Sequence, residues 1–336
     1  MATKLVSPMK IRLFILFLSL LPFTVQAQEY SSSFNVLRMP AATHVAAVGG
    51  QNVSLIEDCA SVGWANPALY ANVTDMTLGL NFMTYSGGSS LMGAHFVKAF
   101  GERHTLATGI QYMNYGSMDE TNETGQVLGS FSAKDMVLGV GYSYLLSDRW
   151  SGGANLKMVY SKLAEFSSLA AAVDVGLNYY DEERDLSVSA VLQNIGTQLK
   201  AYDDGLHSHL PFVMAIGMTK GMAHLPIRFH ITMTDVTRWK SDYYALPDKD
   251  DETVSFSKKL LNHFVLGAEI MPIDNMYLSL GYNFRRAYEL KAAGSSALAG
   301  FSAGGGMQLK NFSFGLSYAQ YHKASNSVMF QAGYSF

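Results

Sequence analysis

The clearest pattern along this chain is an alternation of apolar and polar residues in segments of roughly ten residues. In 135–144, Met136 and Leu138 fall on one face of an extended chain, and Gly139 and Gly141 fall on the other. Successive residues of a strand point to opposite faces, so each segment predicts a strand with one apolar face. We expect about fourteen strands, beginning near residues 75, 91, 104, 134, 150, 168, 186, 211, 227, 262, 276, 298, 312 and 327.

The connections between these strands alternate in length. Every second link is short, about four to six residues or fewer: Gly101, 146–149, 181–185, 221–226, 272–275 and 310–311. The longest of the other links are 116–133, 197–210, 236–261 and 286–297. Short turns on one rim and long loops on the other are typical of outer-membrane barrels. We therefore predict an all-β fold, a transmembrane antiparallel β-barrel of about 14 strands, with the short-turn rim in the periplasm.

Composition agrees with a membrane environment. Only 15% of the residues are charged, against about a quarter in soluble domains, so the apolar faces are expected to contact outer-membrane lipid. A net charge of -3 gives no basic surface for nucleic acid. The single cysteine, Cys59, excludes an intrachain disulfide and a multi-thiolate zinc site, and we expect it to be a small buried residue.

The first 27 residues predict a cleaved signal peptide. Lys4, Lys10 and Arg12 precede an apolar run over 13–25, which ends in a small-residue cleavage site at Ala27. A membrane anchor is the weaker alternative because a spanning helix needs roughly 20 apolar residues. We predict a signal peptide over 1–27, a plug or hatch segment over 28–74 and a barrel over 75–336, exported to the bacterial outer membrane.

Glycines recur on the polar, inward faces of the predicted strands. They are Gly79, Gly109, Gly139, Gly141, Gly153, Gly176, Gly217, Gly267, Gly281, Gly315 and Gly333. Glycine in a strand often marks the close approach of another backbone, for which segment 28–74 is available. The alternative is that these glycines only relieve the curvature of the barrel.

Segment 28–74 carries a set of motifs in a defined order. An Ala/Gly-rich stretch ends at Gly49 and Gly50, an acidic pair ends at Asp58, and an Asn-Pro-Ala triplet follows at 66–68. With the barrel, the residues of this predicted plug motif, Gly49, Gly50, Asp58, Asn66, Pro67 and Ala68, resemble the hatch of FadL-like outer-membrane barrels. The fuller resemblance, supported by 192–196, 210–212 and 299–306, is to the PorV/PorQ family of the type IX protein secretion system of Bacteroidota.

This resemblance implies a non-enzymatic outer-membrane protein that serves the cell-surface attachment of secreted cargo. PorQ-like members are thought to hold the surface protein PorZ, so the implied partners are a PorZ-like protein and the attachment complex. The candidate docking loop is 236–261, with Trp239, Tyr243, Tyr244 and Leu246 as exposed anchors. The alternative is that these side chains fold over the barrel mouth.

The C-terminus carries a separate signal. Tyr334 and Phe336 fall on the lipid face of the last predicted strand, and a terminal aromatic residue resembles the signature of barrels inserted by the outer-membrane assembly machinery.

Candidate chemistry is sparse. The pair His207 and His209 has no positioned third metal ligand, and the acidic run 248–252 lacks the glycine and glutamate spacing of an EF-hand. We expect both to be solvated loops, and we expect no catalytic residue, cofactor or metal. The inward charged residues are expected to pair inside the barrel rather than to conduct chemistry: Lys157, Asp174, Arg228 and Glu269.

Two functions therefore remain. The favoured one is a component of the type IX secretion system that docks a surface partner. The alternative is a FadL-type channel for hydrophobic small molecules, which should have an apolar inward pocket and a wall strand broken by a bulge or proline. The sequence favours the first because the strand segments look uninterrupted and their inward faces look polar or glycine-rich.

Overall fold

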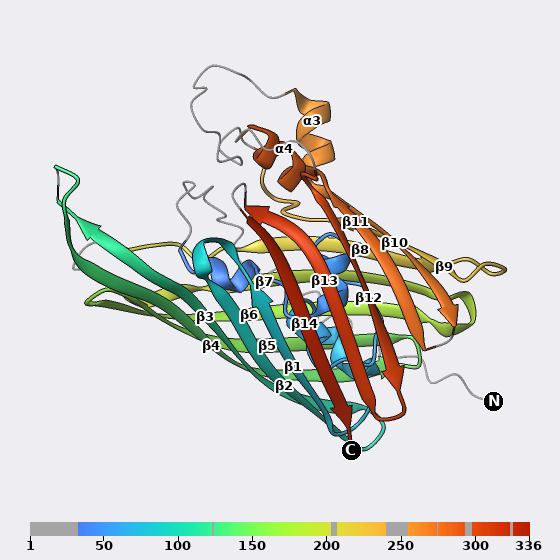
Figure 1. The fold of residues 1–336 in the computed structure, drawn as a ribbon. Coiled ribbons are helices and arrows are strands. Elements are labelled where there is room, and N and C mark those ends of the chain that lie inside the picture. The colour runs from blue at the N-terminus through green and yellow to red at the C-terminus, as the bar shows by residue number, and fades with distance from the viewer. Residues whose placement is uncertain are drawn as a thin grey trace. The chain divides into compact units, whose positions relative to one another are not determined.

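The strands form a closed antiparallel barrel (Figure 1). A computed structural model describes residues 33–122, 124–202, 207–239, 255–273, 275–292, 298–322 and 325–336. Each strand pairs with its neighbour in sequence, and β1 pairs with β14 to close the sheet. The strands are β1 Thr77–Thr84, β2 Ser90–Phe100, β3 His104–Thr121, β4 Val127–Ser147, β5 Trp150–Leu163, β6 Phe166–Asp181, β7 Leu186–Lys200, β8 Val213–Gly221, β9 Ile227–Met233, β10 Phe264–Ile273, β11 Met276–Asn283, β12 Phe301–Leu309, β13 Phe312–His322 and β14 Ser325–Ser335.

The helices are short. They are η1 Asn35–Arg38, α2 Thr43–Ala47, η2 Val62–Trp64, η3 Pro67–Asn72, η4 Ser86–Gly88, η5 Glu182–Arg184, α3 Phe256–Asn262 and α4 Phe284–Ala292. Among the helices of the described ranges, none has the length and apolarity to cross a bilayer.

The two faces of the wall differ as predicted. Leu138 and Leu156 face outward and are 50% and 56% exposed, whereas the inward Lys157 is 1% exposed and Asp174 is fully buried. An apolar outer face is stable where hydrocarbon replaces water, and a closed sheet leaves no strand edge unpaired there. The prediction of a closed barrel of fourteen antiparallel strands is confirmed.

All four predicted long loops contain regular secondary structure: β7 continues into 197–210 as far as Lys200, and α3 takes in the end of 236–261. Most of 116–133 is strand, because β3 and β4 continue as a hairpin on either side of 122–126. Link 286–297 begins within α4, which starts at Phe284. A strand that extends beyond the bilayer has water on both faces. It therefore lacks the alternation of apolar and polar residues by which a strand is predicted from sequence.

The two ends of the barrel differ. In Figure 1, α3 and α4 lie at the end opposite the C-terminus, which is at the short-turn rim. Strands β3 to β7 are longer than strands β8 to β11, so the wall is higher on one side of the barrel.

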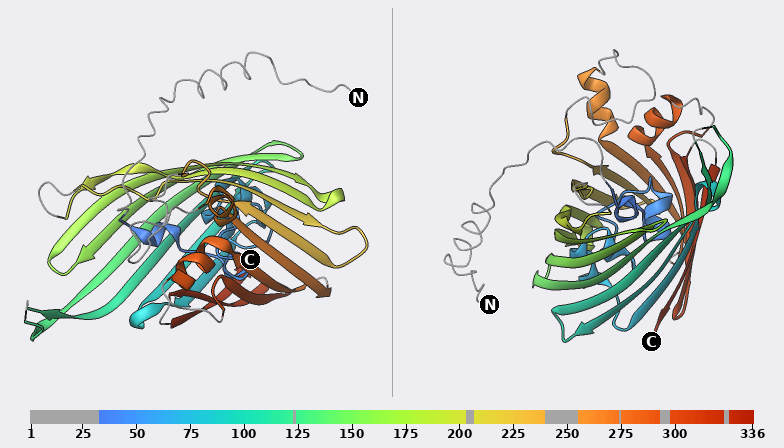
Figure 2. Two further views of the ribbon diagram at one scale, coloured as in Figure 1. Left: turned by 90° about the horizontal axis from the view of Figure 1, so that it is seen from above. Right: turned by 90° about the vertical axis from the view of Figure 1, so that its left-hand side faces the viewer.

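Residues 33–73, called the inner segment below, lie inside the barrel (Figure 2). The segment includes η1, α2, η2 and η3 and supplies many of the most buried side chains, among them Leu55, Trp64 and Leu69. Its α2 helix packs on β11 to β14, and its η3 helix packs on β3 to β6. The signal peptide over 1–27, the start of the plug at 28 and Tyr243, Tyr244 and Leu246 of the docking loop lie outside the described residues. The division of the chain at residue 74 stays a prediction.

Candidate functional site

The inner segment is hydrogen-bonded to the wall where it passes β11 and β12. The carbonyl oxygen of Ala47 accepts a bond from Ser302 Oγ at 2.7 Å, and that of Gly49 accepts one from Asn283 Nδ2 at 3.2 Å. Gly49 and Gly50 have φ angles of 112° and 83°, in the region that favours glycine. These two residues of the predicted plug motif therefore form a tight turn after α2.

The Asn-Pro-Ala triplet makes a second attachment on the opposite wall. Asn66 caps η3 by accepting a bond from the Ala68 amide, and its Nδ2 donates to the Val53 carbonyl at 2.9 Å. Pro67 is the first residue of η3, where a missing N–H costs nothing. The Ala68 carbonyl accepts a bond from Ser151 Oγ of β5 at 2.9 Å. The triplet thus builds a short helix and joins it to the wall.

Ten of the eleven inward glycines face this segment, because an added Cβ would lie within 4 Å of one of its atoms; the exception is Gly333. At Gly153 the added carbon would be 2.6 Å from the Pro67 carbonyl, which is backbone and cannot swing aside. The close approach of two backbones therefore explains the glycines better than curvature alone.

Asp58 and Cys59 fix the later part of the inner segment through hydrogen bonds to Thr74 and to Gln331 of β14. Asp58 accepts bonds from the amide and the hydroxyl of Thr74 at 2.8 and 2.7 Å. Cys59 is 3% exposed, as expected, and its sulfur accepts a bond from Gln331 Nε2 at 2.9 Å. Burial, with a contribution from the Glu57 charge, raises the pKa of the Cys59 thiol to about 12, so this thiol is unreactive while it stays enclosed.

An apolar band covers part of the interior near the long-loop rim. Its inward side chains, each at most 2% exposed, are Met83, Leu91, Met113, Val137, Val159, Ala170 and Met329. They form one cluster with residues of the inner segment that include Phe34, Leu37 and Trp64. The expectation that inward faces are only polar or glycine is wrong here. Positions such as Val137 are flanked by outward apolar residues, so a strand that is apolar on both faces shows no alternation.

A small cavity lies between the inner segment and the wall. It has a volume of about 50 Å³, and its lining includes Leu37, Trp64, Val213 and Ala215. A cavity of about 150 Å³ is needed to enclose a benzene ring. Entry of an aromatic molecule at this place would therefore require the inner segment to move.

The wall is interrupted at β7. The pairing of β6 with β7 shifts between Val173 and Val175, and Asn194, with φ 58°, bonds through its amide to Asp174 Oδ1 at 2.8 Å. Beyond Gln193, β7 has no pairing with β8, which begins at Val213. The expectation of uninterrupted strands is wrong at this point. One extra residue in β7 shifts the alternation by one position, so the outward residues change from Val188 to Ile195 and Leu199.

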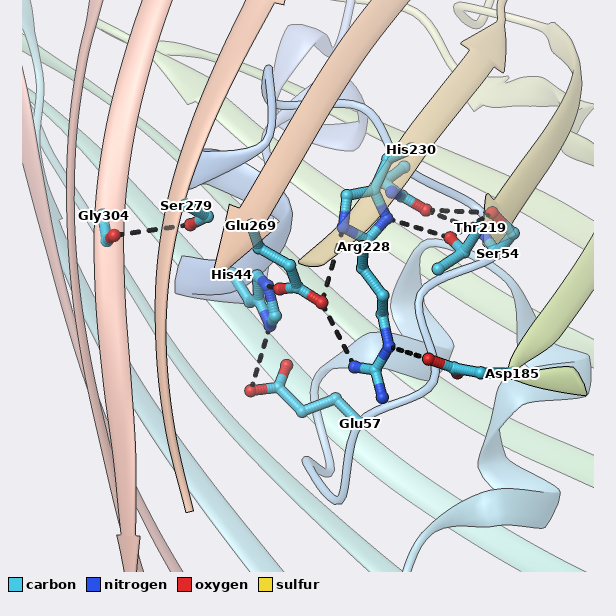
Figure 3. A network of polar contacts seen from close by, with 11 residues as sticks. His44, Ser54, Glu57, Asp185, Thr219, Arg228, His230, Glu269, Ser279 and Gly304 are labelled. Atoms are coloured by element: carbon cyan, nitrogen blue, oxygen red, sulfur yellow. Dashed lines mark hydrogen bonds and ion pairs between the residues drawn. The ribbon is translucent and has the colours of Figure 1, made fainter. Parts of the chain in front are cut away.

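The interior charges pair as predicted. Lys157 Nζ lies 2.5 Å from Asp174 Oδ2, and Arg228 Nη1 lies 3.1 Å from Glu269 Oε1. A further contact comes from His44 of the inner segment, whose Nε2 lies 2.5 Å from Glu269 Oε2 (Figure 3). Burial opposes the protonation of His44, but Glu57 and Glu269 outweigh it and raise its pKa to about 9. Nothing in the local sequence signals this contact between residues 225 positions apart.

The remaining candidates lie at the two rims. His207 and His209 are exposed, and 248–252 lies outside the described residues. Trp239 is 36% exposed and stacks on His263 with ring centroids 4.4 Å apart. At the other rim, Phe336 is 66% exposed and packs edge-on against Tyr334 at 4.9 Å.

Comparison with known proteins gives a fold but no sequence family. No protein-family model matches the chain, and no curated protein matches it. The toluene transporter TbuX of Ralstonia pickettii superposes with a TM-score of 0.54 at 12% identity, covering 89% of this chain and 98% of its own. The toluene transporter TodX of Pseudomonas putida gives 0.51 at 12%, covering 86% and 95%. A FadL homologue of Pseudomonas aeruginosa gives 0.50 at 10%, covering 88% and 98%.

The chain has the FadL-like barrel fold. This is the fold of an outer-membrane barrel, and the proteins that share it in these comparisons are transporters and channels rather than enzymes. At these identities the similarity concerns the fold alone.

Proposed function

We propose that this protein is an outer-membrane channel of the FadL type that admits hydrophobic small molecules, with the inner segment as its plug. The observation that carries the proposal is the apolar band, which gives the lumen a continuous apolar lining beside the inner segment, as a site for hydrophobic molecules requires. Met83 pairs with Leu91 on one side and with Met329 on the other, so the band runs unbroken across β14, β1 and β2.

The interruption of β7 supports the same function. Above Gln193 the outer part of β7 is bonded to β6 but not to β8. Loop residues 207–212 lie against it, with Ser208 N bonded to Gln198 Oε1 at 2.7 Å and Asn194 Nδ2 bonded to the Pro211 carbonyl at 3.1 Å. Separating the outer part of β7 from loop residues 207–212 would break a few hydrogen bonds that involve side chains, but no backbone pairing between strands.

The resting state is closed. Tyr202 stacks on Phe34 with ring centroids 6.2 Å apart, and Leu210 is 4% exposed within the apolar cluster. Passage therefore requires the inner segment and loop 207–212 to move together. The toluene named for two structural neighbours makes monoaromatic hydrocarbons the first substrates to test.

The test introduces a hydroxyl into the apolar band without changing side-chain volume. Val137→Thr and Val159→Thr should each lower uptake of labelled toluene roughly tenfold, because burying an unpaired hydroxyl costs about 1–3 kcal/mol. Val97→Thr is the matched control, since Val97 is equally buried in a separate cluster. If the three variants and the wild type transport toluene and oleate equally, and no better than cells lacking the gene, the channel proposal is wrong.

The second candidate is docking of a PorZ-like surface protein of the type IX secretion system. The observation that favours it is an exposed apolar surface at the long-loop rim, where Phe256, Leu261 and Trp239 are 70%, 50% and 36% exposed. Deletion of the gene should then release cargo that is normally attached to the cell surface, with hydrocarbon uptake unchanged. The structural neighbours favour the channel.

A further inference from the structure

Three ligand-type side chains from distant parts of the chain meet inside the barrel. His44 of α2, His230 of β9 and Glu269 of β10 are 3%, 2% and 2% exposed. Their nearest ligand atoms all lie within 4.8 Å of one another. Figure 3 shows the two imidazole rings on either side of the Glu269 carboxylate.

The orientation of His230 leaves one nitrogen facing this carboxylate. Its Nδ1 is 2.9 Å from Thr219 Oγ1, which is 2.9 Å from Ser54 Oγ. Ser54 Oγ in turn lies 3.4 Å from Asn52 Oδ1. Among the described residues, His230 Nε2 has no hydrogen-bond partner, and it lies 3.6 Å from Glu269 Oε1. A proton or a metal ion between this nitrogen and the carboxylate satisfies both groups in the buried site.

His44 is held in a complementary way. Its Nδ1 lies 3.5 Å from Glu57 Oε1, while its Nε2 is directed at Glu269. The Tyr277 ring stacks on the imidazole at 3.6 Å and 8°, which fixes the plane of the ring. A histidine whose second nitrogen faces a carboxylate or a hydroxyl is the usual arrangement of a metal ligand.

The net charge around these three side chains is compatible with a bound dication. Arg228 contacts Glu269, but its Nε is also 2.8 Å from Asp185 Oδ2, which balances its charge. A metal ion would replace the proton on His44, which leaves Glu57 and Glu269 as two negative charges beside two neutral histidines. A cavity of about 160 Å³ adjoins the cluster and is lined by His44, Glu57 and Glu269 and by residues of the short-turn rim such as Asn275 and Gln308. It has room for water as a further ligand.

We propose that His44, His230 and Glu269 bind a divalent transition metal ion of the zinc type, which fastens the inner segment to strands β9 and β10. Two imidazoles and one carboxylate with an open fourth position are a known ligand set for Zn²⁺. The ion would separate His44 Nε2 from Glu269 Oε2 and displace the proton they share. The site is independent of whether the barrel transports hydrocarbons.

The experiment is a Zn²⁺ titration of the full-length protein in detergent after removal of metal with a chelator, followed by calorimetry and elemental analysis. Wild type should bind one Zn²⁺ per chain. His230→Ala should weaken binding at least 100-fold, and Glu57→Gln should weaken it roughly 10-fold because outer-shell partners contribute 10–100-fold. His95→Ala is the matched control: His95 is an equally buried inward histidine that packs edge-on against Trp64, away from these carboxylates.

A second measurement separates metal loss from misfolding. Zn²⁺ should slow maleimide labelling of Cys59 in the wild type and in His95→Ala, and should leave the rate in His230→Ala unchanged. Absence of stoichiometric binding in the wild type, or equal loss in His95→Ala and His230→Ala, would overturn the proposal. Either result is distinct from the uptake assays, which do not depend on metal.

Discussion

The buried ion pair between Lys157 and Asp174 allows a quantitative test of what holds the interior together. Lys157 is 1% exposed, lies 2.5 Å from Asp174 and has its ammonium 4.9 Å from the centre of the Trp64 ring. Asp174→Asn removes the charge partner and leaves a buried cation, which costs about 3–5 kcal/mol. The contact with Trp64 remains but contributes only about 2 kcal/mol even when desolvated.

Lys157→Met leaves the opposite charge unpaired. Asp174 keeps the Asn194 amide at 2.8 Å and Asn155 Nδ2 at 3.3 Å, so we expect a loss at the lower end, about 3 kcal/mol. The double variant Lys157→Met/Asp174→Asn buries no charge and keeps an acceptor for the Asn194 amide. Its stability should lie within about 2 kcal/mol of the wild type, because replacing a whole buried pair is often neutral.

The assay is guanidinium unfolding of protein refolded in micelles, followed by tryptophan fluorescence and by heat-modifiable migration on gels. The double-mutant cycle should give a coupling energy of roughly 4 kcal/mol or more, the difference between the summed single losses and the loss in the double variant. If the two losses simply add, Lys157 and Asp174 do not act as a pair, and the assignment of the interior charges as structural is wrong.

Further predictions concern the inner segment, the wall and the C-terminus. Gly176→Val should loosen the inner segment, because its side chain would collide with Asn66, and should speed maleimide labelling of Cys59 at pH 8; an unchanged rate would show that the segment tolerates the added bulk. Asn194→Val should destabilise the barrel by about 1–3 kcal/mol, since a β-branched residue is strained at φ 58°, while Asn194→Gly should cost less in the same unfolding assay. Removal of Phe336 should impair membrane assembly, and normal heat-modifiable migration of the shortened chain would contradict this.

The wall could be predicted from the sequence because the bilayer imposes a period of two on every spanning segment. Leu138 and Lys157 were assigned to the correct faces for this reason. The apolar band could not be predicted because at Val137 and Val159 both faces of the strand are apolar, so hydropathy does not distinguish the inner face from the outer one. The bulge at Asn194 leaves only a one-residue shift of the alternation between Val188 and Ile195, which is hard to distinguish from the irregular end of a strand.

The interior contacts depend on proximity that the sequence does not encode locally. His44, His230 and Glu269 come from separate elements. The sequence marks Glu269 as an inward charge, but nothing near His44 or His230 marks either as its partner. Their meeting follows from the closure of the barrel around the inner segment, which fixes α2 against β11 to β14.

The seam between the first and last strands carries a consequence for assembly. Asn81 of β1 donates to the Ala41 carbonyl at 2.7 Å, and Gln331 of β14 accepts from the Thr43 amide at 2.9 Å. Both ends of the wall are therefore tied to neighbouring residues of one enclosed stretch. Closing β1 against β14 and seating this stretch therefore stabilise each other, because both contacts are made at the seam.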